Sequence, residues 1–126
     1  MHRMDDPRGF LPLTPQQFHI LLALTDGRLH GYGIIRDVDA RTGGAVRLGT
    51  GTLYTALARL DALGLVQEST SRPAPAADDQ RRRYYQLTST GRAVLAAETD
   101  RLDALVRHAR RKGIKAGPRP EWSRAK

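Results

Sequence analysis

One segment, from Gly49 to Val66, constrains the fold more than any other part of the chain. Its leucines recur at intervals of three or four residues, which places them on one face of an α-helix: Leu53, Leu57, Leu60 and Leu63. The opposite face carries small, hydroxylated or basic side chains: Tyr54, Thr55, Ala58, Arg59 and Ala62. Gly64 then ends the helix, and Leu65 and Val66 open a strand. Such a helix can pack on a domain through its leucines while its other face enters a DNA major groove.

Length and charge indicate one small domain with a polyanionic partner. The chain has 126 residues, of which 40% are hydrophobic, so a folded core is expected. Its formal net charge is +8 at pH 7, and the positive charge is clustered, which favours nucleic acid before a membrane surface. No apolar run is long enough to cross a bilayer, and the N-terminal residues lack the layout of a signal peptide. We therefore expect a cytoplasmic protein.

Metal and catalytic chemistry find no support. The chain has no cysteine, which excludes disulfide bonds and thiolate metal sites. Its histidines show no ligand spacing: His2, His19, His30 and His108. The acidic pair Asp78 and Asp79 is typical of a solvated loop tip, and no Ser/His/acid arrangement is identifiable. We expect no metal, no cofactor and no enzymatic activity.

The first helix is marked by its capping residues. Thr14 suits the N-cap, Pro15 the first helical position and Gln17 the reciprocal position of a capping box. Leu13 and Phe18 occupy the two positions of a hydrophobic staple. Residues 1–12 show no periodicity, and we expect them to form a loose, flexible arm.

A second helix is predicted to begin near His30 and to end at the paired glycines that follow Thr42. The segment Ala45–Leu48 is a candidate for a one-rung strand, and the leucine-bearing helix follows from about Thr50 to Leu63. A β-hairpin comes next, with strands from Val66 to about Ser71 and from Arg82 to Leu87. Tyr84 and Tyr85 alternate on the returning strand, so one of them is expected in the core rather than facing DNA.

Thr88 can cap a long final helix that runs to about Arg111 and would be roughly 33 Å long. A narrow apolar stripe follows it, interrupted by Glu98: Leu95, Leu102, Leu105, Val106 and Ala109. A helix of this length extends past so small a core, so part of its apolar stripe would remain exposed to water. The simplest way to bury the stripe is to pack it against the same helix of a second copy of the chain.

These elements predict a mainly α fold with a small β-hairpin (α+β): a winged helix-turn-helix domain with a long C-terminal dimerisation helix. The expected organisation is a flexible arm at 1–12, a DNA-binding domain at 13–87, a dimerisation helix at 88–112 and a basic, disordered tail at 113–126.

Three motifs resemble those of the PadR-like transcriptional regulators. The run 30–35 (HGYGII) resembles the start of their second helix, and 49–54 (GTGTLY) the start of their recognition helix. The run 82–92 (RRYYQLTSTGR) resembles the wing return and the entry to their last helix. The resemblance covers roughly residues 14–110 in the right order and spacing. Thr55 departs from the pattern, because the family usually carries proline there.

The expected DNA-binding residues lie on the third helix and the wing. Thr50 and Thr52 can offer hydroxyls at a helix N-terminus that attracts phosphate. Tyr54 can donate its phenol to a phosphate or instead pack against the second helix. Thr55 and Arg59 point away from the leucines, and Arg59 suits a guanine edge, with a solvated surface charge as its alternative. The wing arginines suit phosphate or minor-groove contacts, with a charged edge strand as their alternative: Arg81, Arg82 and Arg83.

The residues and the resemblance together indicate a homodimeric repressor that binds double-stranded DNA at an inverted repeat. The resemblance also implies a small-molecule effector of unknown identity. Multidrug-binding relatives stack ligands on a tryptophan in the last helix, whereas the only tryptophan here, Trp122, lies in the tail. The alternatives are a winged-helix module that binds proteins, or one that senses a ligand, without specific DNA binding.

Overall fold

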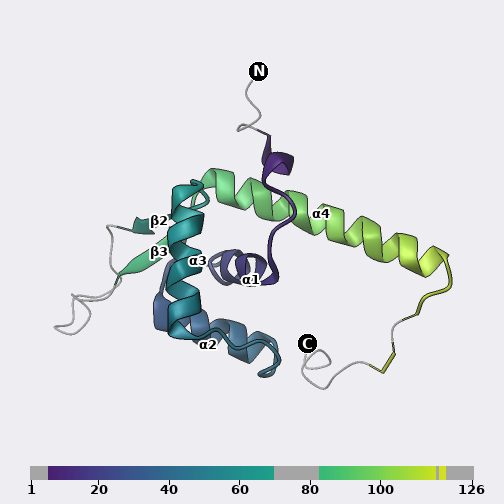
Figure 1. The fold of residues 1–126 in the computed structure, drawn as a ribbon, viewed down its shortest axis with the longest axis horizontal. Helices are drawn as coiled ribbons and strands as arrows, with labels where there is room; N and C mark the ends of the chain where they lie inside the picture. The colour runs from purple at the N-terminus through teal and green to yellow at the C-terminus, as the bar shows by residue number, and fades with distance from the viewer. Residues whose placement is uncertain (1–5, 70–82, 116, 119–126) are drawn as a thin grey trace.

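The computed structural model describes residues 6–69, 83–115, 117 and 118 (Figure 1). The elements in these residues are a 3-10 turn, four helices and three short strands. In chain order they are η2 (Pro7–Phe10), α1 (Pro15–Ala23), β1 (Leu29–His30), α2 (Gly31–Arg41), α3 (Thr50–Ala62), β2 (Val66–Ser69), β3 (Tyr84–Leu87) and α4 (Ser89–Arg111). The helix boundaries expected from the sequence are confirmed to within one or two residues.

The capping residues act as their side chains predict. In α1, Thr14 Oγ1 accepts the Gln17 N–H at 3.1 Å, and Gln17 Oε1 accepts the Thr14 N–H at 2.9 Å, which completes the capping box. His30 caps α2, because its Nδ1 accepts the Gly33 N–H at 3.0 Å. Thr88 caps α4 by accepting the Gly91 N–H at 2.9 Å.

The three strands form one antiparallel sheet in the order β1-β3-β2. The prediction of a strand at Ala45–Leu48 is wrong. The strand that joins the hairpin is instead β1, where Leu29 pairs with Tyr85 and His30 with Tyr84. Thr42 explains the difference, because its Oγ1 accepts the Val46 N–H at 3.0 Å and holds the segment in a turn. Gly43 and Gly44, with φ of 58° and 84°, bend the chain before it.

The core lies where α1, α2 and α3 meet. The predicted leucine face of α3 is confirmed, since Leu53, Leu57 and Leu60 are at most 1% exposed. They pack with the inward residues of the first two helices: Ile20, Leu21, Leu24, Ile34 and Val38. Both tyrosines of β3 are buried, Tyr85 in this core and Tyr84 with the His30 ring edge-on at 5.3 Å.

The start of α4 is bound to the turn that ends α3. The Thr88 N–H donates to the Leu65 carbonyl at 3.1 Å, and the Thr88 hydroxyl donates to the Gly64 carbonyl at 2.6 Å. Gly91 lies so close that a Cβ there would be 2.9 Å from the Leu65 carbonyl carbon. Only glycine fits this approach. The first half of α4 is buried through Val94 and Leu95, and its second half runs out beyond the other helices (Figure 1).

The prediction of a loose arm at 1–12 is wrong for residues 6–12, the part of it that the structure describes. Residues 6–13, which we call the N-terminal strap, include η2 and pack along α4. The Leu13 N–H donates to Glu98 Oε2 at 3.0 Å. Glu98 is only 2% exposed, and it also receives Arg101 Nε at 2.6 Å and Nη2 at 2.9 Å. Glu98 therefore joins the strap to α4 rather than merely interrupting an apolar stripe. The disordered tail proposed at 113–126 lies mostly outside the described residues.

The Glu98 contacts predict a loss of stability in acid. The hydrogen bonds from Arg101, helped by the Leu13 N–H and opposed by burial, hold the pKa of Glu98 below its ordinary value of 4.5. These hydrogen bonds contribute fully to the free energy of unfolding above pH 4.5. That contribution is lost as the pH falls through the lowered pKa of Glu98 in the folded state. We expect Glu98→Gln to lower the free energy of unfolding by about 1–3 kcal/mol at pH 7 and to flatten its decline below pH 4.5. Urea denaturation across this range measures both effects.

Asp103→Asn is the matched control on the same helix. Asp103 pairs with Arg107 at 3.2 Å, but both side chains are more than 60% exposed. Its loss should change stability by less than about 1 kcal/mol. Equal effects of the two substitutions would contradict the role assigned to Glu98.

Candidate nucleic-acid interface

The exposed face of α3 carries every residue that the sequence assigned to it. Opposite the buried leucines, Thr52, Thr55 and Arg59 are exposed, and Tyr54 is 45% exposed. Thr50 is exposed at the start of the helix. With 100° between successive residues, Thr55 and Arg59 lie near the centre of this face, and Thr52 and Tyr54 lie on its two sides. The face therefore offers hydroxyls and a guanidinium to a groove of the right width for a helix.

The N-terminus of α3 is open to an anion. Its N-cap is Gly49, which supplies no side-chain hydrogen bond, and the first turn contains no acidic residue. A Cβ at Gly49 or Gly51 would meet nothing within 4 Å, so nothing in the described chain crowds this end. The first N–H groups of a helix carry partial positive charge and suit a phosphate.

Tyr54 links α3 to the start of α2. A Cβ on Gly31 would collide with the Tyr54 phenol oxygen and would lie 2.7 Å from the ring carbon that bears it. The structure thus places Tyr54 against the second helix, which is the packing alternative, while leaving almost half of it exposed. Burial raises the pKa of Tyr85, and Glu68 and then Tyr54 act in the same direction, so Tyr54 also lies near the wing.

The wing contributes one described arginine to this surface. Arg83 is exposed, and its Nε lies 3.9 Å from Glu68 Oε2, a distance that leaves the ion pair weak in water. Arg81 and Arg82 lie outside the described residues.

Two exposed features outside α3 were missed by sequence reasoning. Tyr32 on α2 is 61% exposed, and the Arg36 guanidinium lies 5.7 Å from the centre of its ring. Arg47, in the turn before α3, is exposed and lies 3.3 Å from Asp39 Oδ1. The spacing of four between Tyr32 and Arg36 on a predicted helix was the available signal.

Residues 6–69, 83–115, 117 and 118 contain no group of three or more His, Cys, Asp or Glu side chains placed to hold a metal ion. None of the described helices is both long and apolar enough to span a membrane.

The sequence matches a known family and two curated relatives. Residues 20–97 match the model of the Transcriptional regulator PadR-like family. Transcriptional regulator Rv3488 of Mycobacterium tuberculosis is 34% identical over 91 residues, which are 72% of this chain and 78% of that protein. An uncharacterized 37.1 kDa protein in a transposon of Streptomyces fradiae is 43% identical over 82 residues. That match spans 65% of this chain but only 21% of the relative's length.

Solved structures share the fold. A transcriptional regulator from Clostridium thermocellum is similar with a TM-score of 0.65 and 25% identity, over 79% of this chain and 90% of that one. Bacillus subtilis PadR in complex with operator DNA is similar with a TM-score of 0.56 and 23% identity, over 87% of this chain and 52% of that one. The described helices and sheet are those of a winged-helix regulator.

The contact between Tyr54 and Gly31 predicts a measurable coupling. Gly31→Ala should lower the free energy of unfolding by on the order of 1 kcal/mol, because the new methyl group displaces the phenol. In a Tyr54→Ala background the same change should be neutral or stabilising, because alanine favours a helix over glycine by about 0.5–1 kcal/mol. Urea denaturation of the four proteins gives the coupling.

Gly51→Ala serves as the control, since a Cβ there meets nothing within 4 Å. It should be no less stable than the parent in either background. Additive effects of Gly31→Ala and Tyr54→Ala would show that the two residues do not touch.

Proposed function

This chain belongs to the PadR-like family of transcriptional regulators, and we propose that it is a repressor that binds an inverted-repeat operator as a homodimer. One observation carries the proposal: α3 buries a continuous leucine face and exposes Thr55 and Arg59 beside an uncapped N-terminus. The likeness to a PadR structure that contains operator DNA supports it.

Base recognition is assigned to the centre of the exposed face. The Arg59 guanidinium suits the two acceptors of a guanine in the major groove, and Thr55 suits a base edge or a thymine methyl group. Thr50 and Thr52 would add hydroxyls near a phosphate that sits on the N-terminus of α3. Threonine at position 55 in place of the family's usual proline keeps a backbone N–H and adds a hydroxyl.

Contacts to the DNA backbone are assigned to the cations around this face. Arg83 on the wing and Arg36 beside Tyr32 are exposed on elements that adjoin Tyr54. We propose the same role for Arg81 and Arg82. Such contacts position the protein on the duplex without reading its sequence.

The second half of α4 is assigned to dimerisation. Leu105 is 54% exposed and Val106 is 46% exposed, and Leu102 and Ala109 complete the stripe. Leu95, also expected in the dimer contact, is 6% exposed and packs in this chain's own core. A second copy that covers the stripe would place two recognition helices in successive major grooves about 34 Å apart. An effector would release the DNA by changing the angle between the two copies.

Salt dependence tests the electrostatic part of the proposal. With roughly 6–10 phosphate contacts, affinity for DNA should fall on the order of a thousandfold between about 50 and 200 mM salt. Gel shifts with DNA from upstream of the protein's own coding sequence measure it. Binding that does not change with salt would contradict these contacts.

Two arginine substitutions separate base reading from backbone contact. Arg59→Ala should relax the preference at one base pair, at a cost of about 1–3 kcal/mol on the preferred site. Arg36→Ala should weaken all sequences about equally and reduce the slope of log affinity against log salt by about one. Competition gel shifts with sites that differ at single positions distinguish the two outcomes.

Arg107→Ala is the matched control, because Arg107 is an exposed arginine on α4. It removes the same charge and should leave the affinity and the slope unchanged. If Arg59→Ala discriminated between sequences like the parent, Arg59 would not be a base-reading residue.

Selection of bound sequences from a random DNA pool tests the whole proposal. We expect an inverted repeat whose half-site centres lie about one helical turn apart. A single, unrepeated site would contradict the homodimer, and no enrichment would contradict sequence-specific binding.

A further inference from the structure

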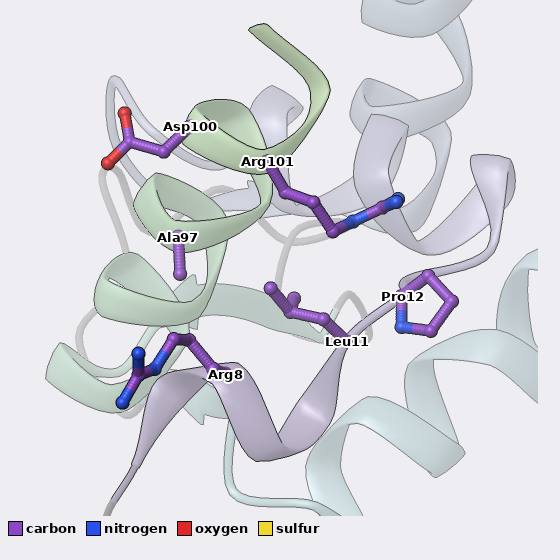
Figure 2. Close-up of a pocket in the computed structure, with 6 residues that line it drawn as sticks. All are labelled: Arg8, Leu11, Pro12, Ala97, Asp100 and Arg101. Carbon is purple, nitrogen blue, oxygen red and sulfur yellow. The ribbon is translucent and has the colours of Figure 1, made fainter. Parts of the chain in front are cut away.

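A cavity of about 550 Å³ lies between the N-terminal strap and α4 (Figure 2). Leu11 and Pro12 of the strap and Ala97 of α4 give it an apolar floor, and Figure 2 shows Leu11 and Ala97 facing one another across it. Its lining is completed by three charged side chains: Arg8, Asp100 and Arg101. A cavity of this size and lining has room for one large aromatic side chain.

The charges of the cavity leave one carboxylate for an incoming group. Arg8 pairs with Asp6 at 3.1 Å, and Arg101 pairs with Glu98 at 2.6 Å. Asp100 is exposed at the edge of the cavity and makes no ion pair with any residue that the structure describes (Figure 2). The occupant that fits such a hollow is an aromatic side chain with a cation a few residues away.

The cavity and the apolar stripe lie on different sides of α4. At 100° per residue, Ala97 lies roughly 130° around the helix from the centre of the stripe. Ala104 and His108 lie within roughly 20° of Ala97 and are exposed. Among the residues that the structure describes, nothing therefore covers this side of α4 between the cavity and the C-terminal end of the helix. A segment that lay along it would leave the stripe free for a second copy.

The chain leaves the helical path at the end of α4. The Ile114 N–H donates to the Ala109 carbonyl at 3.0 Å, and the Gly113 N–H donates to the Arg110 carbonyl at 3.0 Å. With Gly113 at a φ of 90°, these two bonds form a Schellman motif. The motif ends the helix and turns the following residues away from its axis.

The length of the segment that follows matches the distance back to the cavity. Pro118 and Pro120 bias the residues before them toward extended backbone, which advances about 3.1 Å per residue. The eight residues that follow Ile114 then span roughly 25 Å and end at Trp122. Ala97 lies 17 positions before Ile114, which along α4 is also roughly 25 Å. A segment that runs straight back along the helix therefore brings Trp122 to the level of Ala97.

This segment carries both groups that the cavity calls for. Trp122 is the only tryptophan of the chain, and it lies outside the described residues. Arg119 precedes it by three residues, which is roughly 9 Å of extended backbone. Asp100 lies roughly 4.5 Å from Ala97 in the same direction along α4. An arginine side chain is long enough to cover the difference, so Arg119 can meet Asp100 while Trp122 enters the cavity.

We propose that the cavity receives the Trp122 side chain of the same chain, with Arg119 pairing with Asp100. The returning segment holds the strap against α4 from the outside, as Glu98 does from the inside. The strap leads directly into α1, so the two ends of the chain are joined beside the DNA-binding domain. This inference goes beyond the proposed function and needs no second copy, so it stands or fails independently of the homodimer.

The single tryptophan makes fluorescence a direct test, because all tryptophan emission comes from position 122. In the full chain the emission should be shifted to the blue, and acrylamide should quench it several-fold less than in the urea-unfolded chain. Ala97→Arg should return both values toward those of the unfolded chain, because the new side chain fills the cavity. Ala96→Arg is the matched control, since Ala96 is exposed and lies 100° further around α4. Circular dichroism should show the parent's helix content in both variants.

Three outcomes would overturn the proposal. The first is a parent protein whose emission and quenching equal those of the unfolded chain. The second is a protected Trp122 that Ala97→Arg leaves protected, or that Ala96→Arg exposes equally, because the side chain would then be bound elsewhere. The third is quenching that rises on dilution, which would place Trp122 in the cavity of a second copy. Light scattering on the same dilution series reports the homodimer separately.

A charge exchange gives a second measurement that leaves the cavity floor intact. Asp100→Arg and Arg119→Asp should each weaken the docking of Trp122 a few-fold, as expected for an exposed ion pair, and so raise its quenching by acrylamide. The double exchange should restore the parent's quenching, because the pair is re-formed with its signs reversed. Additive losses in the double variant, measured at one salt concentration, would overturn the pairing of Arg119 with Asp100.

Discussion

The short turn at Gly64 and Leu65 supports the arrangement of the whole molecule. Gly64 ends α3 with a φ of 78°, and the Leu65 N–H donates back to the Leu60 carbonyl at 2.9 Å. The Gly64 and Leu65 carbonyls then accept the hydroxyl and the N–H of Thr88, where α4 begins. Gly91 completes the junction by allowing backbone contact. The helix proposed to read DNA and the helix proposed to pair with a second copy are therefore joined at this turn by backbone contact and by the Thr88 side chain.

A second constraint lies about two turns beyond Gly91 along α4, at Glu98. A buried carboxylate is costly unless it is fully paired, and Glu98 is paired by Arg101 and by the Leu13 N–H. These bonds hold the strap against α4 and shape one wall of the cavity. The junction and the carboxylate together make the first half of α4 part of the domain and leave only its second half to project (Figure 1).

Sequence reasoning succeeded where the signal is local. The capping box of Thr14 and Gln17, the Thr88 cap and the leucine spacing of α3 all act within four residues, and all are confirmed. Sequence reasoning failed where two local signals competed for one segment, or where a segment was too short to carry any signal. The two-residue strand β1 is too short to show a period, and the Thr42 hydroxyl captured the segment that had been expected as a strand. The residues of the candidate interface on α3 were predictable, because an exposed face is simply the complement of a buried one.

Local chemistry along the chain thus determined the helices, their ends, the exposed face of α3 and the family. Tertiary packing alone decided which of the remaining residues became buried and which stayed exposed at the surface. Leu13 and Glu98 are 85 positions apart, and no spacing rule connects them. Leu95 and Leu105 carry the same side chain on the same helix, yet only the first lies where the domain covers it. The physical reason is that periodicity and capping depend on neighbours within a helical turn, whereas burial depends on which distant surfaces meet.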